Sequence, residues 1–178
     1  GTTGVPLALM NGSAITAFRT GAIGAVGIKY LTDSNITTLG IIGAGIQGYH
    51  QAYLSTFVRN FREVFIYDIF SEKAKDTCEK LHQARQEVKF TPVQSTDELV
   101  ELSGAIITAT TSEDPVVPNK PELLEGKTFI GIGSYKPNLR ELPDALFTLI
   151  DRVFIDSLQA PEEAGDLLIP LNKGILKM

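Results

Sequence analysis

From residue 38 onward, short runs of apolar, β-prone residues alternate with longer amphipathic stretches. The apolar runs predict six strands, over residues 38–42, 63–67, 89–93, 105–109, 128–132 and 153–156. The amphipathic stretches predict helices over residues 46–59, 72–85, 96–102 and 143–149. Continuously apolar strands separated by helices are typical of a parallel sheet that is covered on both faces. The pattern therefore predicts an α/β fold, a doubly wound parallel sheet of the Rossmann type that binds dinucleotides.

Residues 1–35 show a different pattern. A short apolar strand is predicted over residues 5–10, and a helix over residues 13–31 with Ser13 as its N-cap. Inside this helix Gly21, Gly24 and Gly27 recur every three residues, at a cost of about 1 kcal/mol each relative to Ala. The spacing predicts that another element approaches this face closely, and tight packing of the helix on the sheet is the simplest explanation.

Composition excludes several classes of function. The formal net charge is −5 and the pI is about 5.1, so no basic stripe is available for nucleic acid. No apolar run approaches the roughly 18 residues of a membrane span. The single Cys78 cannot form an internal disulfide and has no metal-ligand spacing around it, so we expect an inert thiol, no metal site and a cytoplasmic location. The first residues lack the features of a signal peptide and an initiator Met, which suggests a trimmed product.

The strongest local motif is the G-x-G-x-x-G formed by Gly43, Gly45 and Gly48 between the first strand and the following helix. The first glycine allows the tight turn, the second lets a pyrophosphate approach, and the third lets helix and strand pack. Asp68 ends the next strand, 25 residues after Gly43. A carboxylate there can accept hydrogen bonds from the adenosine ribose and repel a 2′-phosphate, which favours NAD(H) over NADP(H). The alternative is a turn-forming Asp before a helix cap.

Arg19 is singled out by its neighbours. Ile15, Ala22, Ile23 and Val26 surround it on one helical face, so the guanidinium is expected to emerge from an apolar stripe. A buried Arg needs an anionic partner. That partner is either a structural carboxylate or the carboxylate or phosphate of a ligand.

Polar residues also follow the fourth and fifth strands, at the sheet edge where ligands of such folds bind. Ser134, Tyr135 and Lys136 lie in the segment GIGSYKPN, residues 131–138, where they could donate hydrogen bonds or relay a proton. The alternative is a polar turn. We also expect a line of residues at the cofactor edge, comprising Thr108, Ala109, Thr110 and Thr111.

Other polar residues favour structural interpretations. His50 lies on the apolar stripe of its helix and is interpreted as a packed or interface residue, and His82 is expected to be exposed. Glu162, Glu163 and Asp166 are as consistent with a solvated acidic turn as with a function.

Six segments, taken together, resemble one known family in order and spacing. They are ITAFRTGAIGAVGIKYL, LGIIGAGIQ, ITATTSEDPVV, GIGSYKPNLRELPDALF, VFIDS and PEEAGDL. The chain is similar over nearly its whole length to the ornithine cyclodeaminase/mu-crystallin family. This resemblance implies NAD(P)-dependent chemistry at C–N bonds, such as ornithine cyclodeamination, alanine dehydrogenation or ketimine reduction, commonly in homodimers.

The resemblance also implies roles for individual residues. Arg19 matches the arginine that grips the substrate carboxylate beside the cofactor, with Thr20 next to it at the phosphates. The remaining matches are cofactor contacts: Ile46 and Gln47 in the pyrophosphate turn, Asp68 at the ribose, Thr108, and the nicotinamide-side residues Ile132, Gly133 and Ser134.

Two departures from the family pattern change the expectation. Tyr135 stands where ornithine cyclodeaminases carry a catalytic Asp, and a phenol with a pKa near 10 is a poor base at neutral pH. A ketimine reductase or amino-acid dehydrogenase, acting on a small amino or imino acid, is therefore favoured. The alternatives are a true ornithine cyclodeaminase and a non-catalytic NAD(P)- or ligand-binding protein.

The second departure is length. We expect residues 1–35 to be a remnant strand and linking helix of a substrate and dimerisation domain, and residues 36–178 to be the Rossmann domain. The chain by itself is then expected to be inactive, and the longer protein to be a homodimer.

Overall fold

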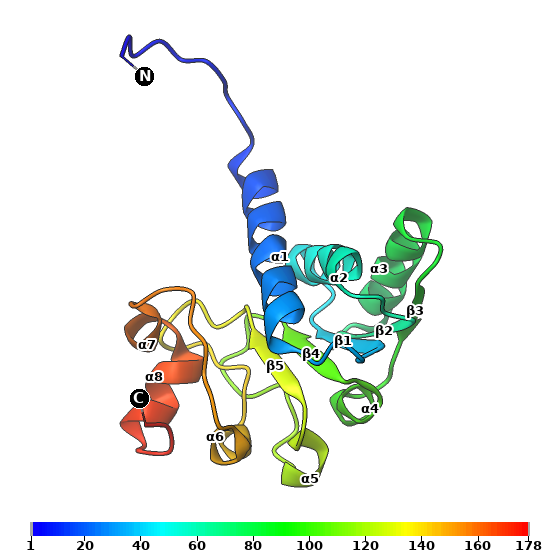
Figure 1. Ribbon diagram of the computed structural model, residues 1–178, viewed down its shortest axis with the longest axis vertical. Helices are drawn as coiled ribbons and strands as arrows, with labels where there is room; N and C mark the ends of the chain where they lie inside the picture. Colours follow the sequence, from blue (N-terminus) through cyan, green and yellow to red (C-terminus); the bar gives the residue numbers. More distant parts are fainter. Residues whose placement is uncertain (1, 178) are drawn as a thin grey trace.

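The computed structural model describes residues 2–177 and has the predicted α/β fold. Five parallel strands form one sheet in the order β3-β2-β1-β4-β5 (Figure 1). The strands are β1 (Thr38–Ile42), β2 (Glu63–Tyr67), β3 (Lys89–Pro92), β4 (Ala105–Thr108) and β5 (Thr128–Gly131). The order reverses between β1 and β4, and in doubly wound folds ligands bind at the carboxyl ends of the strands beside this point.

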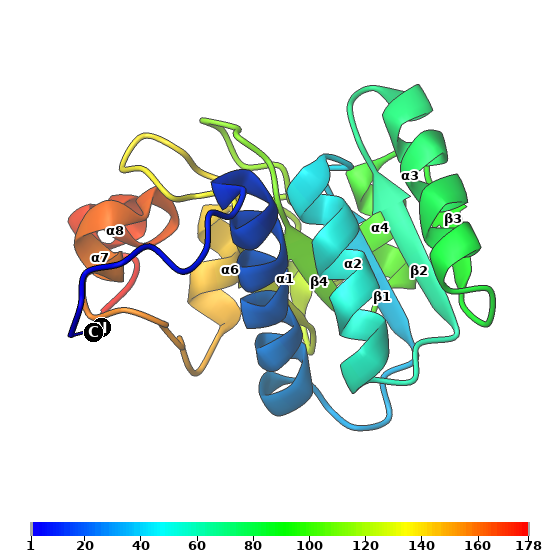
Figure 2. The ribbon, with the colours of Figure 1, turned by 90° about the horizontal axis from the view of Figure 1, so that it is seen from above.

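Helices cover both faces of the sheet (Figures 1 and 2). One layer contains α1 (Gly12–Leu31), α2 (Ile46–Val58) and α3 (Ser71–Ala84). The other contains α4 (Thr96–Leu102), α5 (Pro121–Leu124) and α6 (Asp144–Leu149). Two short helices follow near the C-terminus, α7 (Ala160–Glu163) and α8 (Gly165–Asn172).

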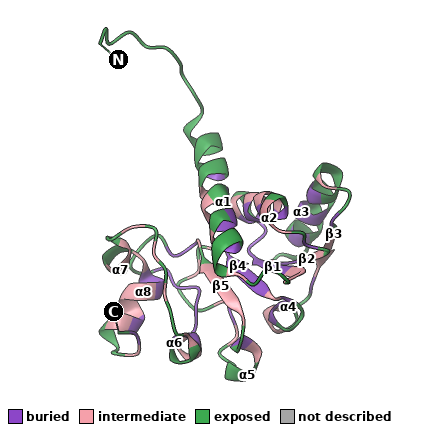
Figure 3. Cartoon of the chain, in the orientation of Figure 1, coloured by how far each residue is buried: buried purple, intermediate pink, exposed green. Residues whose placement is uncertain are grey.

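The central strands are largely apolar because successive side chains enter two different cores. Leu39 and Ile41 of β1 pack beneath the layer of α1, α2 and α3, whereas Ile42 packs against the opposite layer. Ile107 and Ile106 of β4 divide in the same way. Figure 3 shows this burial along the strands and contrasts it with the exposed residues 2–11.

The three glycines of α1 allow close packing, as the sequence predicts. A Cβ on Gly21 would lie 2.9 Å from the Cβ of His50, and one on Gly24 would lie 1.8 Å from Oε1 of Gln51. A Cβ on Gly27 would lie 2.9 Å from Cδ1 of Ile130 in β5. Two of the three glycines therefore face α2 and only one faces the sheet, so the expected helix-on-sheet packing is mainly helix-on-helix packing.

Arg59, directly after α2, closes the other end of this helix pair. Its Nη2 donates to the carbonyl oxygens of Ile28, Lys29 and Thr32 at 3.2, 3.0 and 3.4 Å. The last carbonyls of a helix lack intrahelical donors, and a guanidinium there also complements the negative helix end. The two helices are thus joined both along their length and at the end of α1.

Two predicted strands are wrong. Residues 5–10 and residues 153–156 carry no strand assignment, and Leu9 and Phe154 are exposed. Both runs are β-prone, but a strand also has to pair with a neighbour, and neither run pairs with β5, which has only β4 beside it and keeps a free edge. The cap of α1 is likewise Asn11, whose Oδ1 accepts from the amide of Ala14, and not Ser13. Over residues 2–177, no helix combines the length and apolarity that crossing a membrane would require.

Candidate functional site

The glycine turn after β1 has the geometry that its spacing predicts. Gly43 has a φ of +103°, in the region that L-residues avoid, and a Cβ on Gly48 would lie 1.8 Å from the carbonyl oxygen of Gly43. Gly45 differs from both, because nothing lies within 4 Å of its Cβ position. Two glycines therefore serve the fold, and Gly45 leaves an open approach to the backbone.

Side chains hold the turn from behind. The amide of Ala44 donates to Oδ2 of Asp68 at 2.9 Å, and Oγ1 of the buried Thr77 donates to the carbonyl of Ala44 at 2.9 Å. Ala44 is thus held on both sides, and the first amides of α2, which follow it, have no intrahelical acceptor. Oε1 of Gln47 in this first helical turn is buried without a hydrogen-bond donor among the described residues. Free amides and a positive helix end beside an open Gly45 suit a pyrophosphate.

Asp68 keeps capacity for a ligand. Each of its oxygens accepts one backbone amide, Ala44 on Oδ2 and Phe70 on Oδ1, both at 2.9 Å. An ionised carboxylate has about four acceptor positions, and this one is half-buried at the end of β2. Asp68 can therefore shape the turn and still accept hydrogen bonds from a ribose diol.

Arg19 is exposed, which corrects the expectation of a buried guanidinium. The apolar stripe around it, with Ile15, Ala22 and Val26, is itself exposed, because α1 packs through its small residues. Within residues 2–177 Arg19 forms no salt bridge, so the structural carboxylate that was one of its two expected partners is not found there. Thr20 beside it accepts the side-chain amide of Gln51 through its carbonyl at 2.9 Å, which places both residues alongside the first turns of α2.

The two histidines and the cysteine have the expected structural character. His50 packs edge-on against the rings of Phe18 and Tyr49, with centroids 4.7 and 5.2 Å apart, and His82 is exposed. Burial raises the pKa of the Cys78 thiol to about 12, with a smaller contribution from the charge of Glu79. Across residues 2–177, no group of three or more His, Cys, Asp or Glu residues has metal-binding geometry.

Sequence reasoning missed Glu141, which joins the loops after β4 and β5. Its side chain is fully buried and accepts four hydrogen bonds. Oγ1 of Thr108 and the amide of Gly133 donate to Oε2 at 2.8 and 2.7 Å, and the amide and Oγ1 of Thr110 donate to Oε1 at 2.6 and 2.7 Å. Burial raises the pKa of Glu141, although these hydrogen bonds act in the opposite direction. No local pattern distinguishes this Glu from any other loop acid.

Asp166 is buried too, which corrects its interpretation as a solvated acid. Its Oδ1 accepts the amides of Glu141 and Leu142, both at 2.8 Å, while Oδ2 is buried without a donor among the described residues. Burial raises its pKa to about 6, and the nearby Glu141 charge adds to this. Glu162 and Glu163 are exposed, as a solvated turn requires.

These bonds decide which predicted site residues can reach a ligand through their side chains. Thr108 is fully buried with its hydroxyl bound to Glu141, and the buried Ser134 donates its hydroxyl to the carbonyl of Leu139 at 2.7 Å. Both hydroxyls are therefore used inside the protein, so these two residues would contact a cofactor through their backbone atoms. Tyr135 and Lys136 are exposed, with the ammonium 5.5 Å from the centre of the phenol ring.

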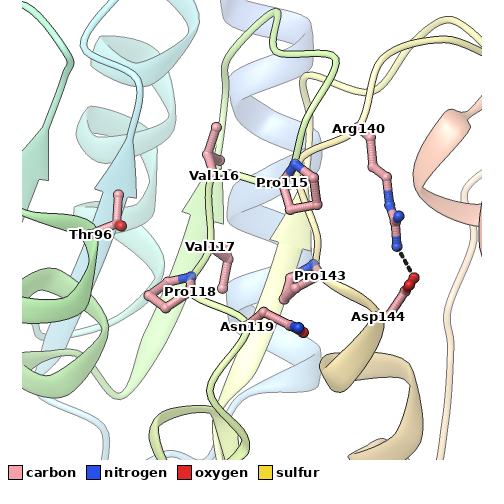
Figure 4. A pocket seen from close by; sticks show the side chains of 9 residues that line it. All are labelled: Thr96, Pro115, Val116, Val117, Pro118, Asn119, Arg140, Pro143 and Asp144. Atoms are coloured by element: carbon pink, nitrogen blue, oxygen red, sulfur yellow. Dashed lines mark hydrogen bonds and ion pairs between the residues drawn. The ribbon is translucent and has the colours of Figure 1, made fainter.

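A shallow groove of about 410 Å³ lies elsewhere, between the start of α4 and the loop after β4 (Figure 4). Pro115, Pro118 and Pro143 line it together with Arg140, whose guanidinium is ion-paired with Asp144. No residue of the glycine turn lines this groove, so it is separate from the candidate dinucleotide site.

Comparison with known proteins shows the family of the chain. The model of the ornithine cyclodeaminase/mu-crystallin family matches residues 1–176. The chain belongs to this family. A Delta(1)-pyrroline-2-carboxylate reductase of Bacillus cereus is 33% identical over 98% of the chain, a region that makes up 53% of that protein.

Two solved structures extend the comparison. The Delta(1)-pyrroline-2-carboxylate reductase of Thermococcus litoralis, in complex with NADH and L-proline, has a TM-score of 0.90 at 35% identity, with 99% of this chain and 54% of that chain covered. An archaeal alanine dehydrogenase dimer with bound NAD has a TM-score of 0.85 at 30% identity, with 98% of this chain and 53% of that chain covered. The present family member thus spans about half the length of these relatives.

Proposed function

We propose that this chain is the NAD(H)-binding part of an enzyme that reduces a small imino acid or oxidises the corresponding amino acid. The observation that carries the proposal is the turn at Gly45, which is open to a ligand while Ala44 is held by Asp68 and Thr77. The relatives crystallised with NADH or NAD support the choice of cofactor. When bound, NADH supplies a hydride to the imine carbon, and the imine nitrogen takes up a proton.

This chain's own residues hold the reactants in place. The free amides at the start of α2 bind the pyrophosphate, and Asp68 binds the adenosine ribose. Arg19 binds the substrate carboxylate, which is consistent with its exposure and its lack of an ion pair within residues 2–177. Ala109, Thr110, Ile132, Gly133 and Tyr135 lie at or near the carboxyl ends of β4 and β5, on the nicotinamide side.

Cofactor preference tests the role of Asp68. We expect Asp68→Asn, which keeps one acceptor oxygen but loses the charge, to shift the NADPH-to-NADH affinity ratio at least tenfold toward NADPH in calorimetric titrations. Asp68→Ser should also weaken NADH, because the turn loses its anchor. The matched control is Asp151→Ser, which removes an exposed acid and should change neither affinity. An unchanged ratio in Asp68→Asn would show that this carboxylate does not select the cofactor.

Substrate class is tested in the protein as encoded, with any sequence that flanks residues 1–178. We expect NADH oxidation with Delta(1)-pyrroline-2-carboxylate or with pyruvate plus ammonia, and no ammonia release from ornithine. Ammonia release with proline formation would instead establish an ornithine cyclodeaminase, despite Tyr135. Saturable NADH binding without turnover of any of these compounds would favour a binding protein.

The domain boundary at residue 35, a homodimer like that of the alanine dehydrogenase relative and a cytoplasmic location are part of this proposal. Sedimentation of the protein as encoded tests the dimer.

A further inference from the structure

The loops after β4 and β5 are joined by one carboxylate. Glu141 accepts from Thr108 and Thr110 on one side and from Gly133 on the other. The loops are also in direct contact, because a Cβ on Gly133 would lie 2.0 Å from the carbonyl oxygen of Thr110 and 2.7 Å from Oε1 of Glu141. One carboxylate group therefore bridges the two loops, next to the backbone hydrogen bond that the amide of Ile132 donates to the carbonyl of Thr108 at 2.9 Å.

The far side of the 131–138 loop is also anchored. Asp166 donates its amide to Oγ of Ser134 at 2.8 Å, and the amide of Gly165 donates to the carbonyl of Lys136 at 3.1 Å. Oδ1 of Asp166 in turn holds the backbone of Glu141 itself. Hydrogen bonds from Glu141 and from the first residues of α8 thus hold the loop from two sides.

Tyr135 lies between these anchored residues, and its own backbone amide donates to the carbonyl of Gly133 at 2.9 Å. Its neighbours Ser134 and Lys136 are both bonded, whereas its own side chain is 61% exposed. A loop that is fixed on both sides of Tyr135 fixes the backbone position from which this side chain extends.

We propose that Glu141 is a positioning residue that fixes the 131–138 loop against the β4 loop and so aligns Tyr135 and the nicotinamide for hydride transfer. This inference rests on the proposed function. Misplacing a reacting group by about 1 Å can cost a hundredfold in rate, so a buried brace behind the loop acts on the reaction without touching it.

Glu141→Gln tests the brace with little change of shape. Each carboxylate oxygen accepts one backbone amide, from Thr110 or from Gly133, and a carboxamide has only one oxygen. Whichever way the Gln turns, its NH₂ group faces one backbone N–H, which then loses its acceptor. We expect faster amide hydrogen exchange at Thr110 or Gly133, measurable without cofactor.

In the protein as encoded, we expect Glu141→Gln to lower kcat about tenfold to a hundredfold while the calorimetric Kd for NADH changes less than threefold. With NADH deuterated at C4, the isotope effect on kcat should rise, because hydride transfer becomes the slow step. A purely structural role would lower thermal stability without moving the isotope effect. Glu125→Gln, which neutralises an exposed acid, should match the wild type.

If Glu141→Gln does not fold, Thr110→Val removes one hydroxyl donor and keeps the backbone bond, and the same changes are expected at smaller size. NADH binding with an unchanged kcat and isotope effect in the folded variant would overturn the positioning role alone. A wild-type protein that fails to bind NADH would overturn the proposed function, and the positioning role with it.

Discussion

The buried carboxyl of Asp166 predicts an unusual dependence of stability on pH. Its pKa rises from 3.8 to about 6 in the folded protein, mainly because burial disfavours the ionised form. Between these values the folded state keeps a proton that the unfolded state has lost. The free energy of unfolding therefore falls as pH rises through this interval, which is opposite to the behaviour of a salt-bridged acid.

The size of the effect follows from the rise in pKa. A rise from 3.8 to about 6 corresponds to about 3 kcal/mol of stability, present below about pH 4 and lost above about pH 6. Asp166→Asn removes the titration and keeps the oxygen that accepts from Glu141 and Leu142. Its NH₂ group takes the place of Oδ2, where the described residues offer no partner. Without a partner, this NH₂ group lowers the free energy of unfolding by about 1–3 kcal/mol. Because this cost is the same at every pH, it does not change the slope of the free energy of unfolding against pH.

Urea unfolding at intervals between pH 4 and pH 7 measures how the free energy of unfolding depends on pH. We expect the stability of Asp166→Asn relative to the wild type to rise by about 3 kcal/mol across this range. Asp151→Asn, at an exposed position, should run parallel to the wild type. Parallel curves for Asp166→Asn and the wild type would refute the argument, since they would mean that Asp166 ionises in the folded protein as readily as in water.

Three further predictions concern the close contacts. Gly45→Val should leave the melting temperature unchanged and weaken NADH binding at least tenfold, because the space around the new side chain is open. Gly48→Ala should lower the melting temperature, because its Cβ would overlap the carbonyl oxygen of Gly43. Equal melting temperatures for the two variants would contradict this contrast. Gly24→Ala should destabilise the protein by about 1–3 kcal/mol in urea unfolding, despite better helix propensity, because its Cβ overlaps Gln51; a stabilised variant would show that the two helices separate without cost. Cys78 should resist a thiol reagent at pH 8 in the folded protein and react after unfolding, and rapid reaction in the native state would disprove its burial.

The sheet could be predicted from sequence because its signals are local. Its strands are runs of five residues or fewer, most of them rich in apolar residues, and the turn at Gly43 needs a backbone conformation that only glycine adopts readily. The run over residues 153–156 has the same local signal but does not pair with the free edge of β5, and local signals do not specify such pairing.

The site was harder to predict than the sheet. Asp68 could be placed because it ends a strand, but Glu141 and Asp166 acquire their roles from residues that lie 8 to 33 positions away, which no spacing rule connects. Arg19 was misjudged because an apolar stripe shows that a face can be covered, not that this chain covers it.

The glycine contacts between α1 and α2 also have a mechanical consequence. A helix of 20 residues is about 30 Å long, and only the part from Ala17 onward has buried residues. A Cβ on Gly21 would lie 3.0 Å from the carbonyl oxygen of His50, and one on Gly24 would lie 1.8 Å from Oε1 of the buried Gln51, so these close contacts hold the crossing angle of the two helices. The N-terminal turns of α1 extend beyond these contacts as a rigid arm, so a small rotation of α1 and α2 together, as one unit, becomes a displacement of several ångströms at the N-terminal end of α1 (Figure 1).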